Sequence, residues 1–254
     1  MVFSYCFAFP NCLFQALLIR LSPMKTQDLI YVALDTDQLD HAVDLAKTLS
    51  PVTGGLKLGM GFVNSFGPQG IEAVRKAAPD AALFIDLKFH DIPNTVAAAV
   101  RTISERFNPA YLNVHAAGGL EMMQRAKEAC ADGTKLLAVT ILTSLDAAAI
   151  RTVGYKGDDV SESVVRLAQL SEKAGLDGVV CSAHEIELLR RACGKAFKLM
   201  VPGIRPTGAA KGDQKRVMTP KEALDLGASH LVIGRPITKA DDPVAAAQAI
   251  LDDL

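Results

Sequence analysis

Three charged residues interrupt an apolar, strand-like segment of the sequence. The segment FIDLKFHDIPNTV, residues 84–96, carries Asp86, Lys88 and Asp91 among side chains that favour burial. Burying a charge is costly unless the charge is paired or used. Side chains two apart on a strand share a face, about 7 Å from one another, whereas their direct neighbours take the opposite face. Asp86 and Lys88 are therefore expected to point together into one site.

A second lysine, Lys57, lies between leucines in the preceding strand-like run. The structural alternative for these charges is a buried salt-bridge set. A buried ion-pair network is a poor source of stability, so we favour a functional role. An alternating array of Lys57, Asp86 and Lys88 keeps each lysine charged and sets a general acid beside a fixed negative charge.

Strand-like runs alternate with helical patterns from Met24 to the C-terminus. The runs lie at 30–35, 54–59, 82–89, 111–116, 135–142, 178–182, 198–203 and 230–235. The segments between them repeat apolar residues at helical spacing; they lie at 39–50, 70–78, 95–107, 119–131, 163–175, 183–194, 219–228 and 242–254. Eight such units in about 230 residues predict an α/β fold, a single-domain (β/α)8 TIM barrel. An open doubly wound sheet is the alternative, weakened because no G-x-G-x-x-G follows the first run.

Active sites of such barrels form at the carboxyl ends of the strands. Asp35 ends the first run, His115 ends the fourth, and Thr143 and Ser144 follow the fifth. His115 is either an acid or base or a structural residue, and lacking a local partner it favours the second. The two hydroxyls either offer groups to a polar ring or cap the next helix.

An anion site is expected after the last two strands, the usual phosphate position in these barrels. The loop VPGIRPTGAAKGDQKR, residues 201–216, is glycine-rich and basic, and the last run ends in VIGRPIT. Backbone N–H groups at a helix start and an arginine fork both suit phosphate. The candidate residues are Arg205, Gln214, Gly234 and Arg235. Loop 203–216 also has the composition of a mobile lid.

Asp91 precedes Ile92-Pro93-Asn94-Thr95. Aspartate and proline are both common where helices begin, so the local sequence favours a helix cap for Asp91.

Composition limits the other possibilities. The formal net charge is −1 and there is no tryptophan, so neither nucleic acid nor a membrane is expected as a partner. The five cysteines are odd in number and have no metal-type spacing, which predicts reduced thiols in the cytoplasm rather than a metal site or a catalytic cysteine.

Residues 1–23 stand apart from the regular pattern. They are apolar, but Pro10 and Asn11 interrupt them and no basic region precedes them. A weak signal-like segment is one alternative. We expect instead an N-terminal extension that is non-native or disordered, with the barrel domain spanning residues 24–254.

Taken together, these motifs resemble the orotidine 5′-phosphate decarboxylase family of the bacterial type. DLKFHDIPNT is similar to its D-x-K-x-x-D-I-P-N-T segment, and VALD, GLKLG, ILTS, VPGIRP, GDQ and VIGRPIT follow in the family's order and spacing over residues 28–252. The resemblance implies conversion of orotidine 5′-monophosphate to UMP, the last step of de novo pyrimidine biosynthesis, with no metal and no organic cofactor.

The resemblance also implies roles for single residues. Lys88 resembles the proton donor to the C6 carbanion, Asp86 lies against the departing carboxylate, and Lys57 completes the array and touches the ribose. The remaining implied contacts are Asp35 to ribose hydroxyls, Thr143 with Ser144 close by to the pyrimidine edge, and Arg205, Gln214, Gly234 and Arg235 to the phosphate.

The family further implies a homodimer with shared active sites. In it Asp91 and Thr95 reach into the neighbouring subunit's site, and Ile92 between them is a substrate-binding residue. This replaces the capping-only interpretation of Asp91.

Two other functions compete with this one. A sugar-phosphate decarboxylase or synthase of the same superfamily has a similar third-strand motif, but it needs Mg²⁺ and an acidic residue at the end of the second strand, where this chain has Lys57. A non-catalytic phosphate-binding barrel is the other, and the complete charged set of Lys57, Asp86, Lys88 and Asp91 argues against it.

Overall fold

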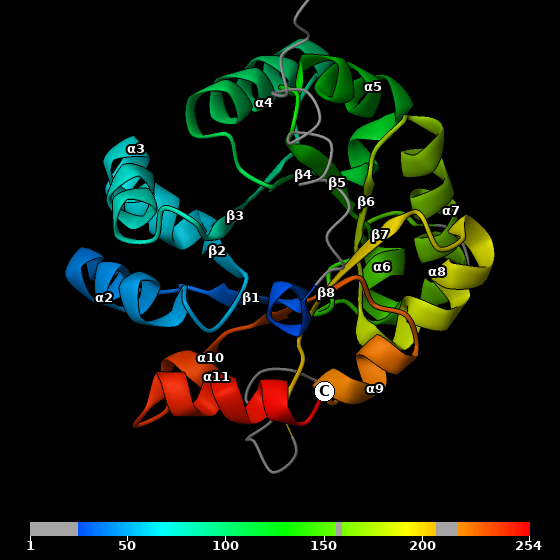
Figure 1. The fold of residues 1–254 in the computed structure, drawn as a ribbon. Helices are drawn as coiled ribbons and strands as arrows, with labels where there is room; N and C mark the ends of the chain where they lie inside the picture. Colours follow the sequence, from blue (N-terminus) through cyan, green and yellow to red (C-terminus); the bar gives the residue numbers. More distant parts are fainter. Residues whose placement is uncertain (1–24, 156–158, 207–217) are drawn as a thin grey trace, which may run out of the picture.

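A closed barrel of eight parallel strands forms the centre of the computed structural model (Figure 1). The structure describes residues 25–155, 159–206 and 218–254. Each strand pairs with the next along the chain, and β8 closes onto β1. The strands are β1 (Ile30–Ala33), β2 (Gly55–Gly59), β3 (Ala82–Phe89), β4 (Tyr111–His115), β5 (Lys135–Val139), β6 (Gly178–Val180), β7 (Lys198–Pro202) and β8 (His230–Ile233). The predicted single-domain (β/α)8 barrel is confirmed.

Helices surround the strands as an outer ring (Figure 1). They are α2 (Leu39–Leu49), α3 (Met60–Ala77), α4 (Pro93–Phe107), α5 (Gly119–Ala129), α6 (Ala147–Thr152), α7 (Val160–Lys173), α8 (Ile186–Cys193), α9 (Pro220–Asp225), α10 (Arg235–Thr238) and α11 (Pro243–Asp252). Short 3-10 turns precede β1 at Thr26–Leu29, α5 at Ala116–Gly118 and α8 at Ala183–Glu185. The apolar faces of the helices pack on the outward-facing strand residues and form the larger core.

A second, smaller core fills the inside of the barrel. Tyr31, Phe84, Tyr111 and Met200 are among its buried members. The rings of Tyr31, Phe84 and Tyr111 meet edge to face, for example Tyr31 and Tyr111 with centroids 5.7 Å apart. Phe84 belongs both to this core and to the wall of the cavity above it, so the inner core is the floor of the site.

Two helical segments were missed by the sequence periodicity. Helix α3 begins at Met60 rather than near Gly70, and Gly67, with φ of 59°, kinks it just before Pro68. The kink changes the direction of the apolar face, so its first turns do not continue the pattern that follows. Helix α6 is only six residues long, too short to show a helical period.

Several predictions concern residues outside the described ranges. These are the N-terminal extension 1–23, Gln214, and residues 207–216 of the expected lid. Within the ranges that are described, no helix is both long and apolar enough to cross a membrane.

Candidate active site

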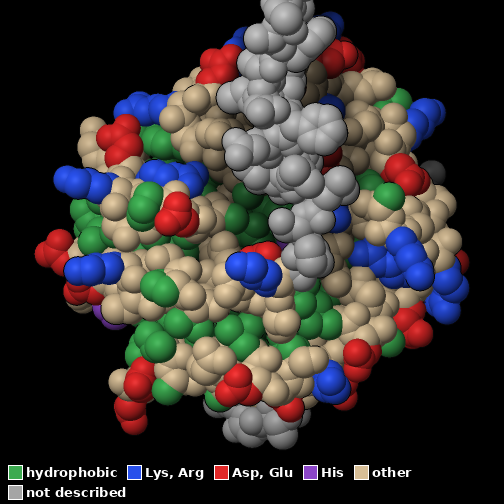
Figure 2. Space-filling view, viewed as in Figure 1, with side chains coloured by type: hydrophobic (Ala, Val, Ile, Leu, Met, Phe, Trp, Pro, Cys, Tyr) green, Lys and Arg blue, Asp and Glu red, His purple; other side chains and the backbone are tan. Residues whose placement is uncertain are grey.

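A cavity of about 540 Å³ opens at the carboxyl ends of the strands. Most of the predicted site residues line it together: Asp35, Lys57, Asp86, Lys88, Thr143, Arg205, Gly234 and Arg235. Thr238, the last residue of the VIGRPIT motif, and Lys239, which follows it, line the cavity as well; neither was singled out in the sequence. Charged side chains of both signs are interspersed over the face of the molecule seen in Figure 2, in keeping with the near-neutral net charge.

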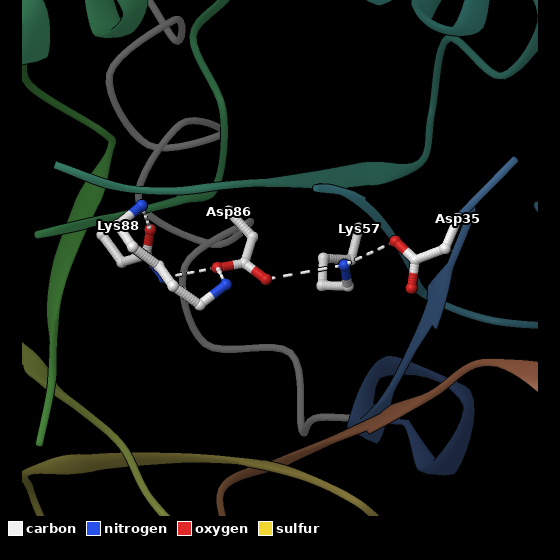
Figure 3. A network of polar contacts seen from close by, with 5 residues as sticks. Asp35, Lys57, Asp86 and Lys88 are labelled. Atoms are coloured by element: carbon white, nitrogen blue, oxygen red, sulfur yellow. Dashed lines mark hydrogen bonds and ion pairs between the residues drawn. The ribbon is translucent and has the colours of Figure 1, made fainter. Parts of the chain in front are cut away.

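Four charged side chains of alternating sign form a continuous row in this cavity (Figure 3). Lys57 Nζ lies 3.1 Å from Asp35 Oδ1 and 3.5 Å from Asp86 Oδ2. Lys88 Nζ lies 2.6 Å from Asp86 Oδ1. The row runs from Asp35 at the exposed rim to the nearly buried Lys57 and Asp86. The array expected from strand spacing is therefore present, and Asp35 extends it by one residue.

The carboxylate of Asp86 is held in its charged form. Burial acts to raise its pKa, but the charges of Lys57 and Lys88 and the hydrogen bonds from Lys88 and Asn113 outweigh burial, so the pKa of Asp86 lies below its usual value. This fixed negative charge lies 2.6 Å from Lys88 Nζ. The array thus places the amine of Lys88 beside a carboxylate that stays ionised.

The backbone of β3 is irregular where it carries this pair. Lys88 has φ of 52°, in the left-handed region that residues other than glycine seldom adopt. The pairing of β3 with β4 shifts register between Ile85 and Phe89. Strand bulges of this kind occur next to active sites, where they redirect side chains.

Asn113, on β4, contacts both members of the pair. Its side-chain Oδ1 accepts a hydrogen bond from the backbone N–H of Lys88 at 2.8 Å, and its Nδ2 donates to Asp86 Oδ1 at 2.7 Å. The residue is completely buried. Asn113 was not predicted from the sequence; the available signal was a polar residue inside the buried run YLNVH.

The opposite side of the cavity is cationic. The pKa of Arg205 is lowered, first by burial and then by the like charge of Arg235, so the two guanidinium groups lie close enough to repel one another. Gly234 precedes the short helix α10, which begins at Arg235. A bound anion at this position would relieve the repulsion between the two arginines.

Thr143 lines the cavity, in agreement with its predicted place near the substrate. The alternative role of Thr143 and Ser144 as helix caps is wrong, because Asp146 caps α6 by accepting a hydrogen bond from the backbone N–H of Ala149.

Asp91, Ile92 and Thr95 are exposed and do not line the cavity of this chain. The capping role considered for Asp91 is wrong. The N-cap residue of α4 is Ile92, no side chain caps the helix, and Asp91 Oδ1 accepts a hydrogen bond only from the adjacent N–H of Ile92 among the bonds described, at 2.7 Å.

His115 does not line the cavity either. Its ring stacks on that of His90 with centroids 5.3 Å apart, and its Nδ1 atom is buried without a hydrogen-bond partner in the described part of the chain. Burial, followed by the neighbouring His90 and Lys88, lowers the pKa of His115. A neutral ring packed in this way agrees with the structural role favoured from the sequence.

A metal site does not emerge from the described ranges: they hold no group of three or more His, Cys, Asp and Glu side chains placed to bind an ion. The Lys57 ammonium lies between the carboxylates of Asp35 and Asp86, where a positive charge opposes binding of a divalent cation.

Comparison with known proteins gives a consistent set of relatives. A curated protein of Novosphingobium aromaticivorans named orotidine 5′-phosphate decarboxylase is 49% identical over 221 residues, covering 87% of this chain and 96% of that protein. One of the same name from Shewanella sediminis is 50% identical over 231 residues, covering 89% of this chain and 96% of that protein.

Solved structures agree with the sequence relatives. The crystal structure of orotidine 5′-phosphate decarboxylase from Lactobacillus acidophilus superimposes with a TM-score of 0.75 at 34% identity, covering 89% of this chain and 98% of that one. Residues 28–250 match the model of the family described as orotidine 5′-phosphate decarboxylase / HUMPS. With a match over most of its length and relatives at this identity, the chain belongs to the orotidine 5′-phosphate decarboxylase / HUMPS family.

Proposed function

We propose that this chain converts orotidine 5′-monophosphate to UMP and CO₂, the last step of de novo pyrimidine biosynthesis, with neither a metal ion nor an organic cofactor. The observation that carries the proposal is the row Asp35, Lys57, Asp86 and Lys88 in one cavity with a cationic end. The names of the curated relatives support the same reaction.

Lys88 is the proton donor in this proposal. When the bond from C6 to the carboxylate breaks, CO₂ leaves and the electron pair remains on C6. The Lys88 ammonium stabilises that charge and then transfers a proton to C6, forming the C–H bond of UMP; solvent reprotonates the amine. Preorganised cations in a cavity sheltered from water are well suited to this, because they need no rearrangement as charge develops.

Asp86 lies against the departing carboxylate in the bound substrate. Its own negative charge is fixed by Lys57, Lys88 and Asn113, so it stays ionised when a second carboxylate approaches. Loss of CO₂ removes that second charge, so the contact is more favourable after the bond breaks than before.

The cationic side of the cavity binds the phosphate. Arg205, Gly234 and Arg235 lie there, and we include Gln214 from the sequence motif. Asp35 and Lys57 bind the ribose and Thr143 contacts the pyrimidine edge. Energy from the distant phosphate contacts can then be expressed in the transition state for decarboxylation.

The active form in this proposal is a homodimer. Asp91, Ile92 and Thr95 are exposed on the chain, and Ile92 exposes 67% of its surface, unusual for an isoleucine. We propose that these residues complete the site of a second copy of the chain. We also place the enzyme in the cytoplasm, which suits the free thiols of Cys130, Cys181 and Cys193.

The decisive test follows the absorbance of orotidine 5′-monophosphate with purified protein in the presence of EDTA. We expect turnover that EDTA does not change. Absence of turnover would refute the proposed reaction. Turnover that EDTA removes and Mg²⁺ restores would show that the reaction needs a metal ion and would refute the metal-free part of the proposal.

A further inference from the structure

Asn113 occupies the one position of β4 that faces the irregular part of β3. Leu112 pairs with Ile85 and Val114 pairs with Phe89, so Asn113 alone lies opposite the three residues 86–88. The regular ladder is interrupted there, and a side chain must replace the missing backbone partner.

The amide of Asn113 uses both of its ends at this point. Its oxygen accepts the backbone N–H of Lys88, and its nitrogen donates to Asp86 Oδ1, the same oxygen that receives the Lys88 ammonium. The first bond holds Lys88 in its left-handed conformation, which is unfavourable for a lysine without such support. The second fixes the orientation of the Asp86 carboxylate.

We infer that Asn113 is a positioning residue, which holds the bulge of β3 so that the Lys88 ammonium and the Asp86 carboxylate face the reacting carbon together. This inference rests on the roles proposed above for Asp86 and Lys88. Asn113 itself does not line the cavity, so it acts only through those two residues.

Asn113→Ala removes both hydrogen bonds. Bonds to charged groups are worth enough for kcat on orotidine 5′-monophosphate to fall about 10- to 100-fold. KM and the affinity for UMP are expected to change by less than about threefold, because the phosphate and ribose contacts remain.

Thr134→Val is the matched control. Thr134 is also buried, and its hydroxyl donates to the carbonyl of Pro109 at 2.8 Å, joining the chain before β4 to the start of β5. The control therefore loses a buried hydrogen bond at the amino ends of β4 and β5 without touching the array, and its kcat should stay near that of the parent.

Asn113→Asp gives a readout that a purely structural role would not produce. With the new carboxyl protonated, its O–H can donate to Asp86 and its carbonyl can accept from Lys88, as the amide does. When the carboxyls of Asp86 and of the new aspartate are both ionised, their negative charges repel at hydrogen-bond distance. The pKa for loss of the second of the pair's two protons is therefore raised. The kcat of this variant relative to the parent should fall by up to about tenfold per pH unit above that pKa.

Other charged groups near this point are common to the parent and the variant. They are Lys88 on the same stretch of β3, Lys57 on β2 behind Asp86, Asp35 beyond it, and the stacked pair of His90 and His115. Taking the ratio of variant to parent at each pH cancels their own titrations to first order.

The outcomes separate the two proposals. Suppose that the parent is active and Lys88→Ala is inactive. An Asn113→Ala enzyme with a kcat within about threefold of the parent would then overturn the role of Asn113 and leave the proposed reaction standing. A pH-independent ratio for Asn113→Asp would overturn it as well. Circular dichroism checks whether the variants fold. If both Asn113 variants are unfolded while Thr134→Val is folded, Asn113 would be assigned to barrel stability instead. A parent without turnover would refute the reaction itself.

Discussion

The ammonium of Lys88 lies 2.6 Å from Oδ1 of Asp86, with both side chains largely shielded from solvent. A shielded ion pair is weak support for a fold, because the cost of removing two charges from water offsets most of their attraction. Its value in this barrel is geometric: it holds the end of Lys88, the proton donor of the proposed mechanism, in the cavity.

Removal of that donor is the first prediction. Lys88→Ala should lower kcat on orotidine 5′-monophosphate by at least about 1,000-fold, because general acid catalysis and charge stabilisation are lost together. Binding of UMP should persist, since the phosphate contacts remain. Lys127→Ala is the control, because Lys127 makes an ion pair of the same length with Asp177 away from the cavity. A Lys88→Ala enzyme with near-normal kcat would remove Lys88 from the chemistry.

The second prediction concerns the effect of adding a side chain at Gly59. A Cβ atom there would lie 3.0 Å from Lys57 Nζ and 3.1 Å from Asp35 Oδ1, so the ends of those side chains must move. The φ of Gly59 is −86°, which alanine adopts without strain. Gly59→Ala should therefore lower kcat/KM about tenfold by displacing the array, at a stability cost of about 1 kcal/mol or less.

Gly61→Ala is the control for this change. The position is two residues further along α3, and a Cβ there meets nothing within 4 Å. Steady-state kinetics on both variants decides the matter: equal kinetics for the two would show that the crowding at Gly59 has no effect on the reaction.

Much of this site could be predicted from the sequence because its geometry is local. Asp86 and Lys88 are two residues apart on one strand, and Lys57 lies on the strand beside it, so strand order and side-chain alternation bring them together. The strands themselves are short apolar runs separated by helical periods, which is a strong signal in a β/α repeat.

The contacts of Asn113 could not be predicted in the same way. They depend on a register shift between β3 and β4 and on the left-handed backbone conformation of Lys88. Neither feature can be recognised from the residue types. The first half of α3 was missed for a related reason, because Gly67 and Pro68 interrupt the apolar period with a kink.

The third prediction concerns the phosphate. Arg235→Ala should weaken UMP binding by about 10-fold or more, because a guanidinium to phosphate contact is charge-assisted. Uridine, which has no phosphate, should bind the variant and the parent equally. Isothermal titration with both ligands measures this, and Arg191→Ala, on the exposed surface of α8, controls for loss of one positive charge. An equal loss for uridine and UMP would contradict a phosphate contact.

A buried histidine below the site sets the fourth prediction. His230 Nδ1 lies 3.2 Å from the carbonyl oxygen of Asp28, which can only accept, so Nδ1 carries the proton and Nε2 accepts from the Tyr111 hydroxyl at 2.8 Å. Burial is the main cause that lowers the pKa of His230 from 6.5 to about 4, and the hydrogen bond to Asp28 opposes it only in part.

Acid should therefore destabilise the barrel in a defined window. Between pH 6.5 and about 4 the unfolded chain binds a proton at this histidine that the folded chain does not, so the free energy of unfolding falls as the pH is lowered, by about 3 kcal/mol in total. His230→Gln should flatten the pH dependence in that window, as measured by denaturant unfolding. The exposed His184 provides the control, and a His184→Gln variant with the same flattening would contradict this origin.

Sharing of residues between subunits is the last prediction. Lys88→Ala alone leaves no competent donor in either site of a dimer, and Asp91→Ala alone leaves both sites without the residue lent by the partner. In a mixed dimer the two defects fall in the same site, because Asp91 of one chain serves the Lys88 of the other. The second site then has both residues intact.

Mixing the two inactive variants under conditions that exchange subunits should restore up to about one quarter of the parent activity, since half of the dimers are hybrids and each hybrid has one intact site. Each variant re-mixed with itself is the control. Mass spectrometry of intact dimers verifies that subunits have exchanged. If the exchanged mixture remains inactive, that result would show that Asp91 acts within its own chain.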